Sequence, residues 1–150
     1  MARIAVVGSL NADLLVRVSR HPRPGETLHG SGGEIAPGGK GANQALAAAL
    51  LGGDVAMVGA VGDDAWAGPA TALLRDAGVD LGALRVVAGA TGLAIVAVAD
   101  SGENAIIVIP GANGTMDAAA AEEAAGTARA WAGWRWCSCS CGWRRCLRAR

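Results

Sequence analysis

The sequence predicts an α/β fold built on a mostly parallel sheet. Short β-branched runs that end in glycine, at residues 3–8 and 55–62, are typical of buried strands. Alanine- and leucine-rich segments at 46–51 and 65–77, each followed by glycine, are typical of helices, and we expect Leu73 and Leu74 of the second to face inward. Because strand and helix alternate, we expect parallel strands joined by right-handed crossovers.

The second half of the chain adds a predicted hairpin and a further helix. Residues 91–98 and 104–109 flank Asp-Ser-Gly-Glu at 100–103, a turn of hairpin composition, so these two strands should be antiparallel. A loop is expected at 110–115, and an Ala/Glu-rich helix from Met116 to about Ala130. Further extended segments are expected at 14–18, 27–35 and 84–87.

A chain of 150 residues with 52% apolar residues is long enough to form one domain with its own core. No apolar run approaches the roughly 18 to 20 residues of a membrane span, and the N-terminus lacks the apolar core of a secretion signal. We therefore expect a soluble, cytoplasmic protein with no membrane partner. The net charge of zero hides an uneven distribution. All 13 acidic residues lie at or before Glu123, and the only charged residues after it are arginines.

A glycine-rich stretch at 36–45 leads into the first predicted helix. Glycine lets a backbone approach a ligand closely, and a helix start presents unpaired N–H donors. Lys40, the only lysine of the chain, lies at that start. The alternative is an ordinary strand-to-helix turn with Lys40 in solvent. A phosphate-binding P-loop is excluded, since no Ser or Thr follows the lysine.

Asn11 and Asp13 follow the first strand, at the carboxyl end where open α/β sheets bind ligands. Asx side chains also form turns by bonding their own backbone, and that alternative stays open. His21 and His29 have no partner at metal-ligand spacing. We expect both histidines at the surface and no metal site.

These motifs together resemble the ribokinase family of sugar kinases, also called the PfkB carbohydrate kinases. The resemblance covers residues 1 to about 130. Its strongest element is Gly-Gly-Lys-Gly-Ala-Asn-Gln-Ala at 38–45, followed in register by Gly52 and Gly62. Further fragments occur in the order that the family shows, at 8–13, 24–27, 62–64, 91–92 and 110–113.

The resemblance implies a ribokinase-like fold, of which residues 1–130 are the N-terminal half of a mostly parallel, three-layer sheet. Segments at about 12–36 and 91–109 would form a small β lid over the sugar. In the family this lid often pairs two subunits, so a homodimer is implied.

The resemblance also implies that ATP phosphorylates the primary 5-hydroxyl of D-ribose, with Mg²⁺ on the nucleotide and K⁺ as activator. Another sugar or nucleoside kinase of the family is the alternative. Asn11 and Asp13 would hold sugar hydroxyls, which carboxamides and carboxylates can match as paired donors and acceptors. Ala12 belongs to the same substrate-binding segment. The other side of the sugar ring would be lined by Gly39, Lys40, Gly41, Ala42 and Asn43.

The phosphate-handling half of the family has no counterpart in these 150 residues. The family's catalytic aspartate lies in a Gly-Ala-Gly-Asp motif, which this sequence lacks. Because phosphoryl transfer depends on positioning and charge stabilisation of the phosphates, we expect this chain to be inactive, with no catalytic residue of its own. A non-catalytic module that binds sugar or dimerises is the alternative function.

Residues 131–150 have a different composition and include all 4 cysteines of the chain. Thiolates bind metals and arginines bind nucleic acids, but Cys-x-Cys-x-Cys-x₄-Cys is not zinc-finger spacing, so we expect neither partner. We interpret this tail as a shifted reading frame. Leu, Val and Gln codons of a GC-rich gene yield Trp, Cys, Ser and Arg when read out of step. Sequencing the gene would test this interpretation. An intact reading frame, together with related chains that carry the same Cys- and Trp-rich tail, would contradict it.

Overall fold

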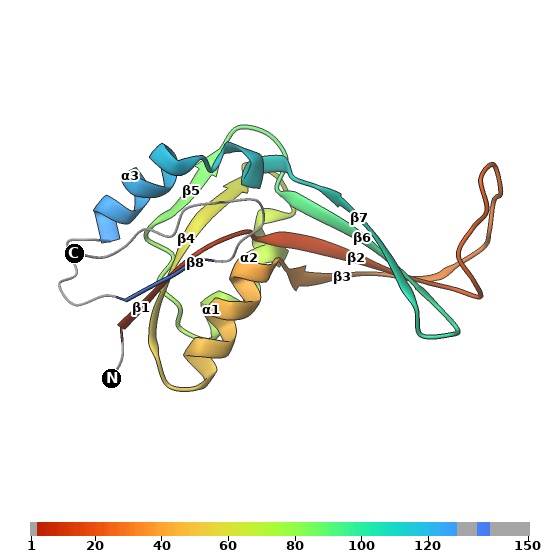
Figure 1. Ribbon diagram of the computed structural model, residues 1–150, viewed down its shortest axis with the longest axis horizontal. Coiled ribbons are helices and arrows are strands. Elements are labelled where there is room, and N and C mark those ends of the chain that lie inside the picture. Colours follow the sequence, from red (N-terminus) through yellow and green to blue (C-terminus); the bar gives the residue numbers. More distant parts are fainter. Residues whose placement is uncertain (1–2, 129–134, 139–150) are drawn as a thin grey trace.

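The core of the molecule is a four-stranded sheet in the order β5-β4-β1-β8, and all neighbouring strands run parallel. The computed structural model describes residues 3–128 and 135–138 (Figure 1). The parallel α/β sheet expected from the sequence is therefore confirmed. Its strands are β1 (Arg3–Val7), β4 (Asp54–Gly62), β5 (Leu84–Val87) and β8 (Arg135–Ser138).

Helices cover both faces of this core sheet, which makes three layers. Ala45 of α1 (Lys40–Leu50) and Leu74 of α2 (Ala67–Asp76) belong to one buried cluster with Met57. Ala120 of α3 (Ala118–Ala128) belongs to a second cluster with Val58. Met57 and Val58 are successive residues of β4, so their side chains point to opposite faces of the sheet. No helix among the described residues is long and apolar enough to cross a membrane.

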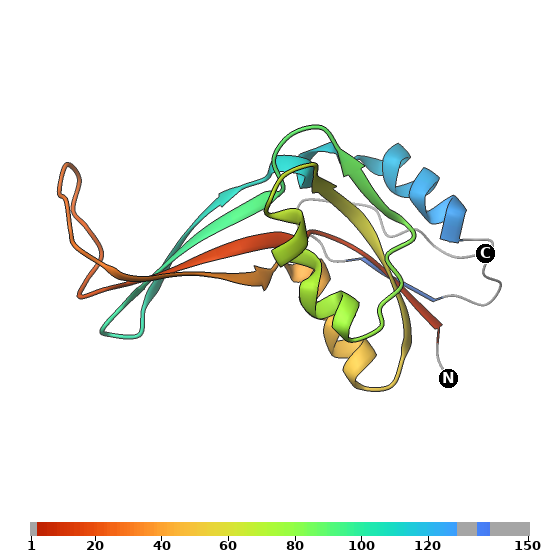
Figure 2. The same cartoon turned by 180° about the vertical axis from the view of Figure 1, so that it is seen from behind.

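A second sheet, which we call the arm, projects from this core (Figures 1 and 2). Its strand order is β3-β2-β6-β7, in which β2 and β6 are parallel and the two outer pairs are antiparallel. The two segments expected to form a lid are the ones that build it. The strands are β2 (Asn11–Val18), β3 (Ser31–Gly38), β6 (Gly92–Ala99) and β7 (Asn104–Ile109).

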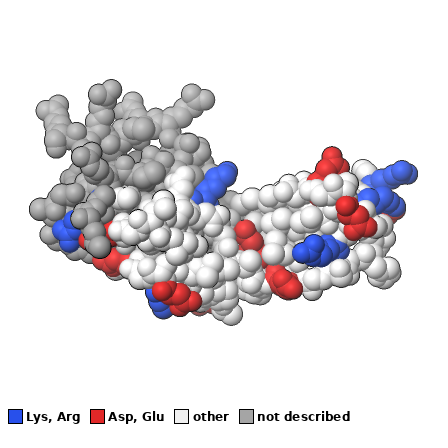
Figure 3. Space-filling model, turned by 90° about the horizontal axis from the view of Figure 1, so that it is seen from below, with Lys and Arg blue, Asp and Glu red and all other residues white. Residues whose placement is uncertain are grey.

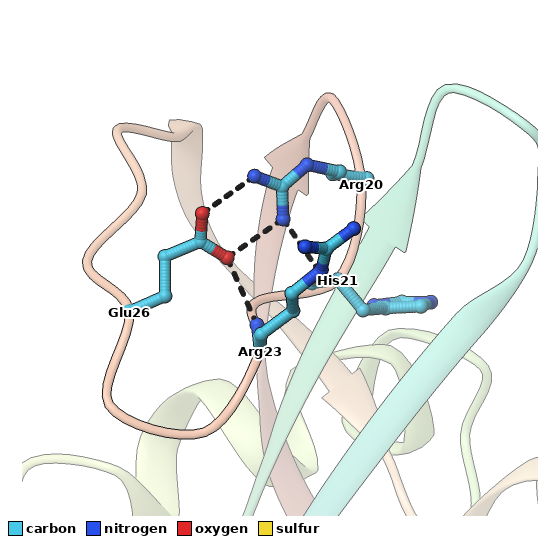
Figure 4. A network of polar contacts seen from close by, with 4 residues as sticks. All are labelled: Arg20, His21, Arg23 and Glu26. Carbon is cyan, nitrogen blue, oxygen red and sulfur yellow. Dashed lines mark hydrogen bonds and ion pairs between the residues drawn. The ribbon is translucent and has the colours of Figure 1, made fainter.

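The loop between β2 and β3 forms the free end of the arm and is closed by an ion pair (Figure 4). The Arg20 guanidinium donates to both carboxylate oxygens of Glu26, at 2.7 and 2.5 Å, and the Arg23 N–H donates to the same carboxylate at 2.9 Å. These hydrogen bonds lower the pKa of Glu26 to about 2, and the bond from the Arg20 side chain has the largest effect. Figure 3 shows charged side chains of both signs toward this end of the arm.

Several boundaries differ from the sequence-based expectation. The strand expected at 27–35 begins only at Ser31, where β3 starts to pair with Arg17 of β2. Residues 111–115 form the short helix η1 (Gly111–Thr115) and not a loop. Leu74 is buried as expected, but Leu73 is 45% exposed, since adjacent positions of a helix cannot both face the sheet.

Part of the unusual tail belongs to the core sheet. Residues 135–138 are β8, which pairs in parallel with β1. Residues 129–134 and 139–150 lie outside the described part of the chain, as do most of the tail's cysteines. The shifted reading frame therefore stays a prediction.

Candidate substrate-binding site

The start of α1 packs directly against the connection between β1 and β2. The Ala42 N–H donates to the Ser9 carbonyl oxygen at 3.1 Å. A Cβ on Gly41 would lie 2.6 Å from the Gly8 backbone, and one on Gly39 would lie 2.5 Å from the Ser9 oxygen. The glycines of this motif are therefore required because protein backbone packs on protein backbone.

This contact decides which residues of the α1 start can present side chains to a ligand. Gly39 and Gly41 have none, and Ala42 is buried in the core. Lys40 and Asn43 are exposed and lie three residues apart in the first turn, on the same side of the helix. Of the five residues predicted on this side of the sugar, these two contribute polar side chains.

Asn11, Ala12 and Asp13 lie in β2 and not in a turn, paired with the last residues of β3. Alternate residues of a strand point to opposite faces, so Asn11 and Asp13 share one face and Ala12 faces the other. The Ala12 side chain is fully buried. A Cβ on Gly39 would lie 2.9 Å from the Asn11 nitrogen, so the two predicted halves of the site do meet.

Asp13 has an incomplete set of hydrogen bonds. Its Oδ1 is buried and has no partner among the described residues. Its carboxylate lies against Gly38, where any Cβ would overlap it. Burial raises the pKa of Asp13. Because a buried acceptor without a donor costs free energy, this carboxylate is suited to a ligand that brings a donor, such as a hydroxyl.

A second polar cluster connects the arm to the core. Oδ1 of Asp64 accepts from the Thr91 hydroxyl at 2.6 Å, and its Oδ2 accepts from the Thr91 N–H at 3.0 Å. The Thr91 hydroxyl oxygen accepts in turn from the Gly62 N–H at 3.0 Å. The hydrogen bond from the Thr91 side chain is the main reason that the pKa of Asp64 is lowered. The end of β4 is thereby tied to the start of β6, beside the candidate site.

Sequence reasoning assigned no role to two residues that complete this region. Thr91 forms the cluster just described, and Asn113 donates from Nδ2 to Oδ1 of Asn11 at 2.9 Å. Thr91 and Asn113 lie in the fragments at 91–92 and 110–113 that resemble the family. That resemblance was the only indication in the sequence that these two residues matter. The Asn11–Asn113 contact joins residues 102 positions apart, so no local spacing could reveal it.

The hollows on the arm lie apart from Asn11 and Asp13. Two hollows of about 270 and 160 Å³ lie on the arm, and neither is lined by Asn11 or Asp13. No group of three or more His, Cys, Asp or Glu side chains within 3–128 and 135–138 is arranged to hold a metal.

Residues 1–133 match the model of the pfkB family of carbohydrate kinases. The chain is 43% identical over 114 residues to a ribokinase of Bacillus subtilis, which covers 75% of this chain and 39% of that protein. It is 41% identical over 126 residues to a ribokinase of Schizosaccharomyces pombe, which covers 79% of this chain and 40% of that protein.

The structure is similar to that of Arabidopsis thaliana ribokinase complexed with ribose and ATP. The TM-score is 0.66 and the identity 44%, over 75% of this chain and 38% of the other. The chain thus spans about two fifths of the length of the relatives that it matches. With the family match over residues 1–133 and the ribokinase-like arrangement of core and arm, this chain belongs to the pfkB family of carbohydrate kinases.

Proposed function

We propose that this chain forms the sugar-binding half of a kinase that transfers a phosphoryl group from ATP to the 5-hydroxyl of D-ribose. The observation that carries the proposal is the Asp13 carboxylate, which has a buried acceptor without a donor on the face that it shares with Asn11. A ribose hydroxyl would supply that donor. The identity of 41–43% to ribokinases and the ribose in the Arabidopsis complex support ribose as the sugar.

Each side of the sugar has a defined role in this proposal. Asn11 and Asp13 bind hydroxyls from the arm, and Lys40 and Asn43 bind from the first turn of α1. The backbone around Gly39 lets these two sides come close. A sugar that lacked a matching hydroxyl would leave buried polar groups unpaired, which gives strong discrimination.

The phosphate-handling groups belong to a part of the family that this chain does not contain. ATP, its Mg²⁺ and an activating K⁺ would bind there in a full-length relative, and a cytoplasmic location would fit this use of ATP. Closure of the arm over the sugar would exclude water and limit ATP hydrolysis.

The purified chain should bind D-ribose without phosphorylating it. Titration calorimetry with ribose, and with sorbitol as an open-chain control, measures the binding. A coupled assay with ATP, Mg²⁺ and K⁺ measures turnover. Binding of ribose with no turnover above the blank is expected, because the sugar side is present and the Gly-Ala-Gly-Asp motif is absent. Equal heats for ribose and sorbitol would contradict sugar recognition, and measurable turnover would contradict the inactive fragment.

We also propose that the arm pairs two copies of the chain. Ile107 of β7 is 63% exposed and continues an apolar row across the sheet, formed by Ile35, Leu14, Ile95 and Ile107. Asp13 points to the opposite face, since it neighbours Leu14 on β2. A partner on the apolar row would cover exposed hydrophobic surface and leave the sugar-binding face accessible.

Sedimentation equilibrium should give twice the 14.9 kDa of one chain. Ile107→Glu should shift the mass to that of the monomer, because the substitution places a charge in the apolar row. Leu51→Glu is the matched control, since Leu51 is 89% exposed at the C-terminal end of α1, and Figure 1 shows that this end of the helix lies away from the arm. A dimer that persists in Ile107→Glu would exclude this face as the interface.

A further inference from the structure

Asn113 connects η1 to the junction of β1 and β2 by three hydrogen bonds. Its Oδ1 accepts from the Leu10 N–H at 3.0 Å. Its Nδ2 donates to the Leu10 carbonyl oxygen and to Oδ1 of Asn11, both at 2.9 Å. The Asn113 side chain thus binds both backbone polar groups of Leu10 and the side chain of the next residue.

The backbone of Leu10 fixes the orientation of both carboxamides. A peptide N–H only donates and a peptide carbonyl only accepts, so Asn113 must place its oxygen on the first and its nitrogen on the second. The remaining N–H of Asn113 then needs an acceptor, which Asn11 supplies through Oδ1. Within the described residues, Nδ2 of Asn11 has no acceptor of its own, and this donor is left for a ligand.

The surrounding glycines leave room for this contact. Gly92 pairs with Asn11 across β2 and β6, and a Cβ on Gly92 would lie 2.5 Å from Asn11 Oδ1 and would overlap Asn113 Nδ2. Gly111 has a φ of 49°, and a Cβ there would lie 2.5 Å from the Ala90 oxygen. The glycines of the fragments at 91–92 and 110–113 therefore both allow Asn113 to approach Asn11.

We propose that Asn113 is a positioning residue, which holds the Asn11 carboxamide so that its nitrogen, and not its oxygen, is offered to the sugar. The binding face then presents a fixed pair, a donor on Asn11 and an acceptor on Asp13. A sugar hydroxyl at Asn11 must accept a hydrogen bond, and a sugar hydroxyl at Asp13 must donate one. The placement of donor and acceptor therefore selects the orientation of the sugar. This inference rests on the proposed binding of sugar at these two residues.

The orientation is tested in the ligand-free chain by hydrogen exchange of the side-chain NH₂ groups, followed by NMR. Both protons of Asn113 should be protected, because each is hydrogen-bonded, whereas those of Asn11 should exchange at least roughly tenfold faster. In Asn113→Asp, the introduced carboxylate can only accept, so Asn11 must turn and donate to it. The Asn11 proton that it donates should then become protected. Equal protection of Asn11 and Asn113 in the unchanged chain would overturn the proposal.

Ribose affinity gives the second measurement. Asn113→Asp should weaken ribose binding by roughly tenfold or more, since an acceptor replaces the donor that faces the sugar. Asn104→Asp is the matched control, because it adds the same charge at an exposed position of β7, and it should leave the affinity unchanged. Unchanged ribose affinity in a folded Asn113→Asp chain would overturn the positioning role.

The two measurements separate the inference from the proposed function. A chain that binds no ribose would contradict the proposed function, while the exchange rates of the unchanged chain would still decide the orientation of Asn11. If Asn113→Asp does not fold, those same rates decide the proposal without the variant.

Discussion

Gly39→Ala should destabilise the fold by about 2–5 kcal/mol and abolish ribose binding. Two costs combine at this residue. Gly39 has a φ of 95°, a conformation that side chains rarely adopt, and a Cβ would lie 2.5 Å from the Ser9 oxygen and 2.8 Å from the Leu10 Cα. Because these contacts are with backbone, no side-chain rotation relieves them. The start of α1 would have to move away from the β1–β2 connection, which separates the two sides of the site.

Urea unfolding and ribose calorimetry measure these two effects. Gly33→Ala is the matched control, since Gly33 has a similar φ of 88° but no atom within 4 Å of the position that an added methyl group would take. Gly33→Ala should lower the stability of the fold only by the cost of the backbone conformation, about 1–2 kcal/mol, and should keep the affinity for ribose. Equal losses in the two variants would mean that backbone conformation alone, and not the contact with Ser9, explains the requirement for glycine.

The parallel core and the hairpin of the arm were predictable because their signals are local. The strand at Leu84–Val87 has the predicted bounds, and β7 begins and ends where its turn and apolar pattern indicate. Leu73 and the start of β3 were predicted wrongly for a different reason. The exposure of Leu73 depends on how α2 is rotated against the sheet, and the start of β3 depends on where the loop rejoins β2, which composition does not reveal.

The candidate site was predictable in its members but not in their arrangement. The resemblance indicated Asn11, Asp13 and the α1 start, which the fold does bring together. It could not indicate that the side chains of Ala12 and Ala42 are turned into the interior, because this depends on the face of each element. Nor could it indicate that Asn113 holds Asn11, since that contact requires η1 to return to the β1–β2 junction.

Asp13→Asn should weaken ribose binding by roughly 10- to 150-fold and at the same time make the fold more stable at pH 7. The affinity falls because a hydrogen bond from a sugar hydroxyl to a carboxylate is replaced by one to a neutral amide. The stability rises because the unbound chain must hold a carboxylate whose buried Oδ1 has no donor. An isosteric amide removes the charge and keeps the shape.

The pH dependence gives this prediction a definite sign. Burial raises the pKa of Asp13 in the folded chain above the unfolded value of about 3.9. The folded state therefore holds its proton to higher pH, and the carboxylate penalises folding progressively as pH rises from that unfolded value through the folded pKa. The stability difference between Asp13→Asn and the unchanged chain should be largest near pH 7 and should shrink as pH falls toward about 4.

Urea unfolding at a series of pH values measures that difference directly. Asp64, whose pKa is lowered, contributes stability that is lost as pH falls, but it is present in both chains and cancels from the comparison. Asp100→Asn is the matched control, because Asp100 is exposed in the turn of the arm, and it should change neither the affinity nor the slope. A variant that lost both stability and affinity would mean that Asp13 serves the fold. A gain in stability together with a loss of affinity is the result expected if the Asp13 carboxylate binds the ligand at the expense of stability.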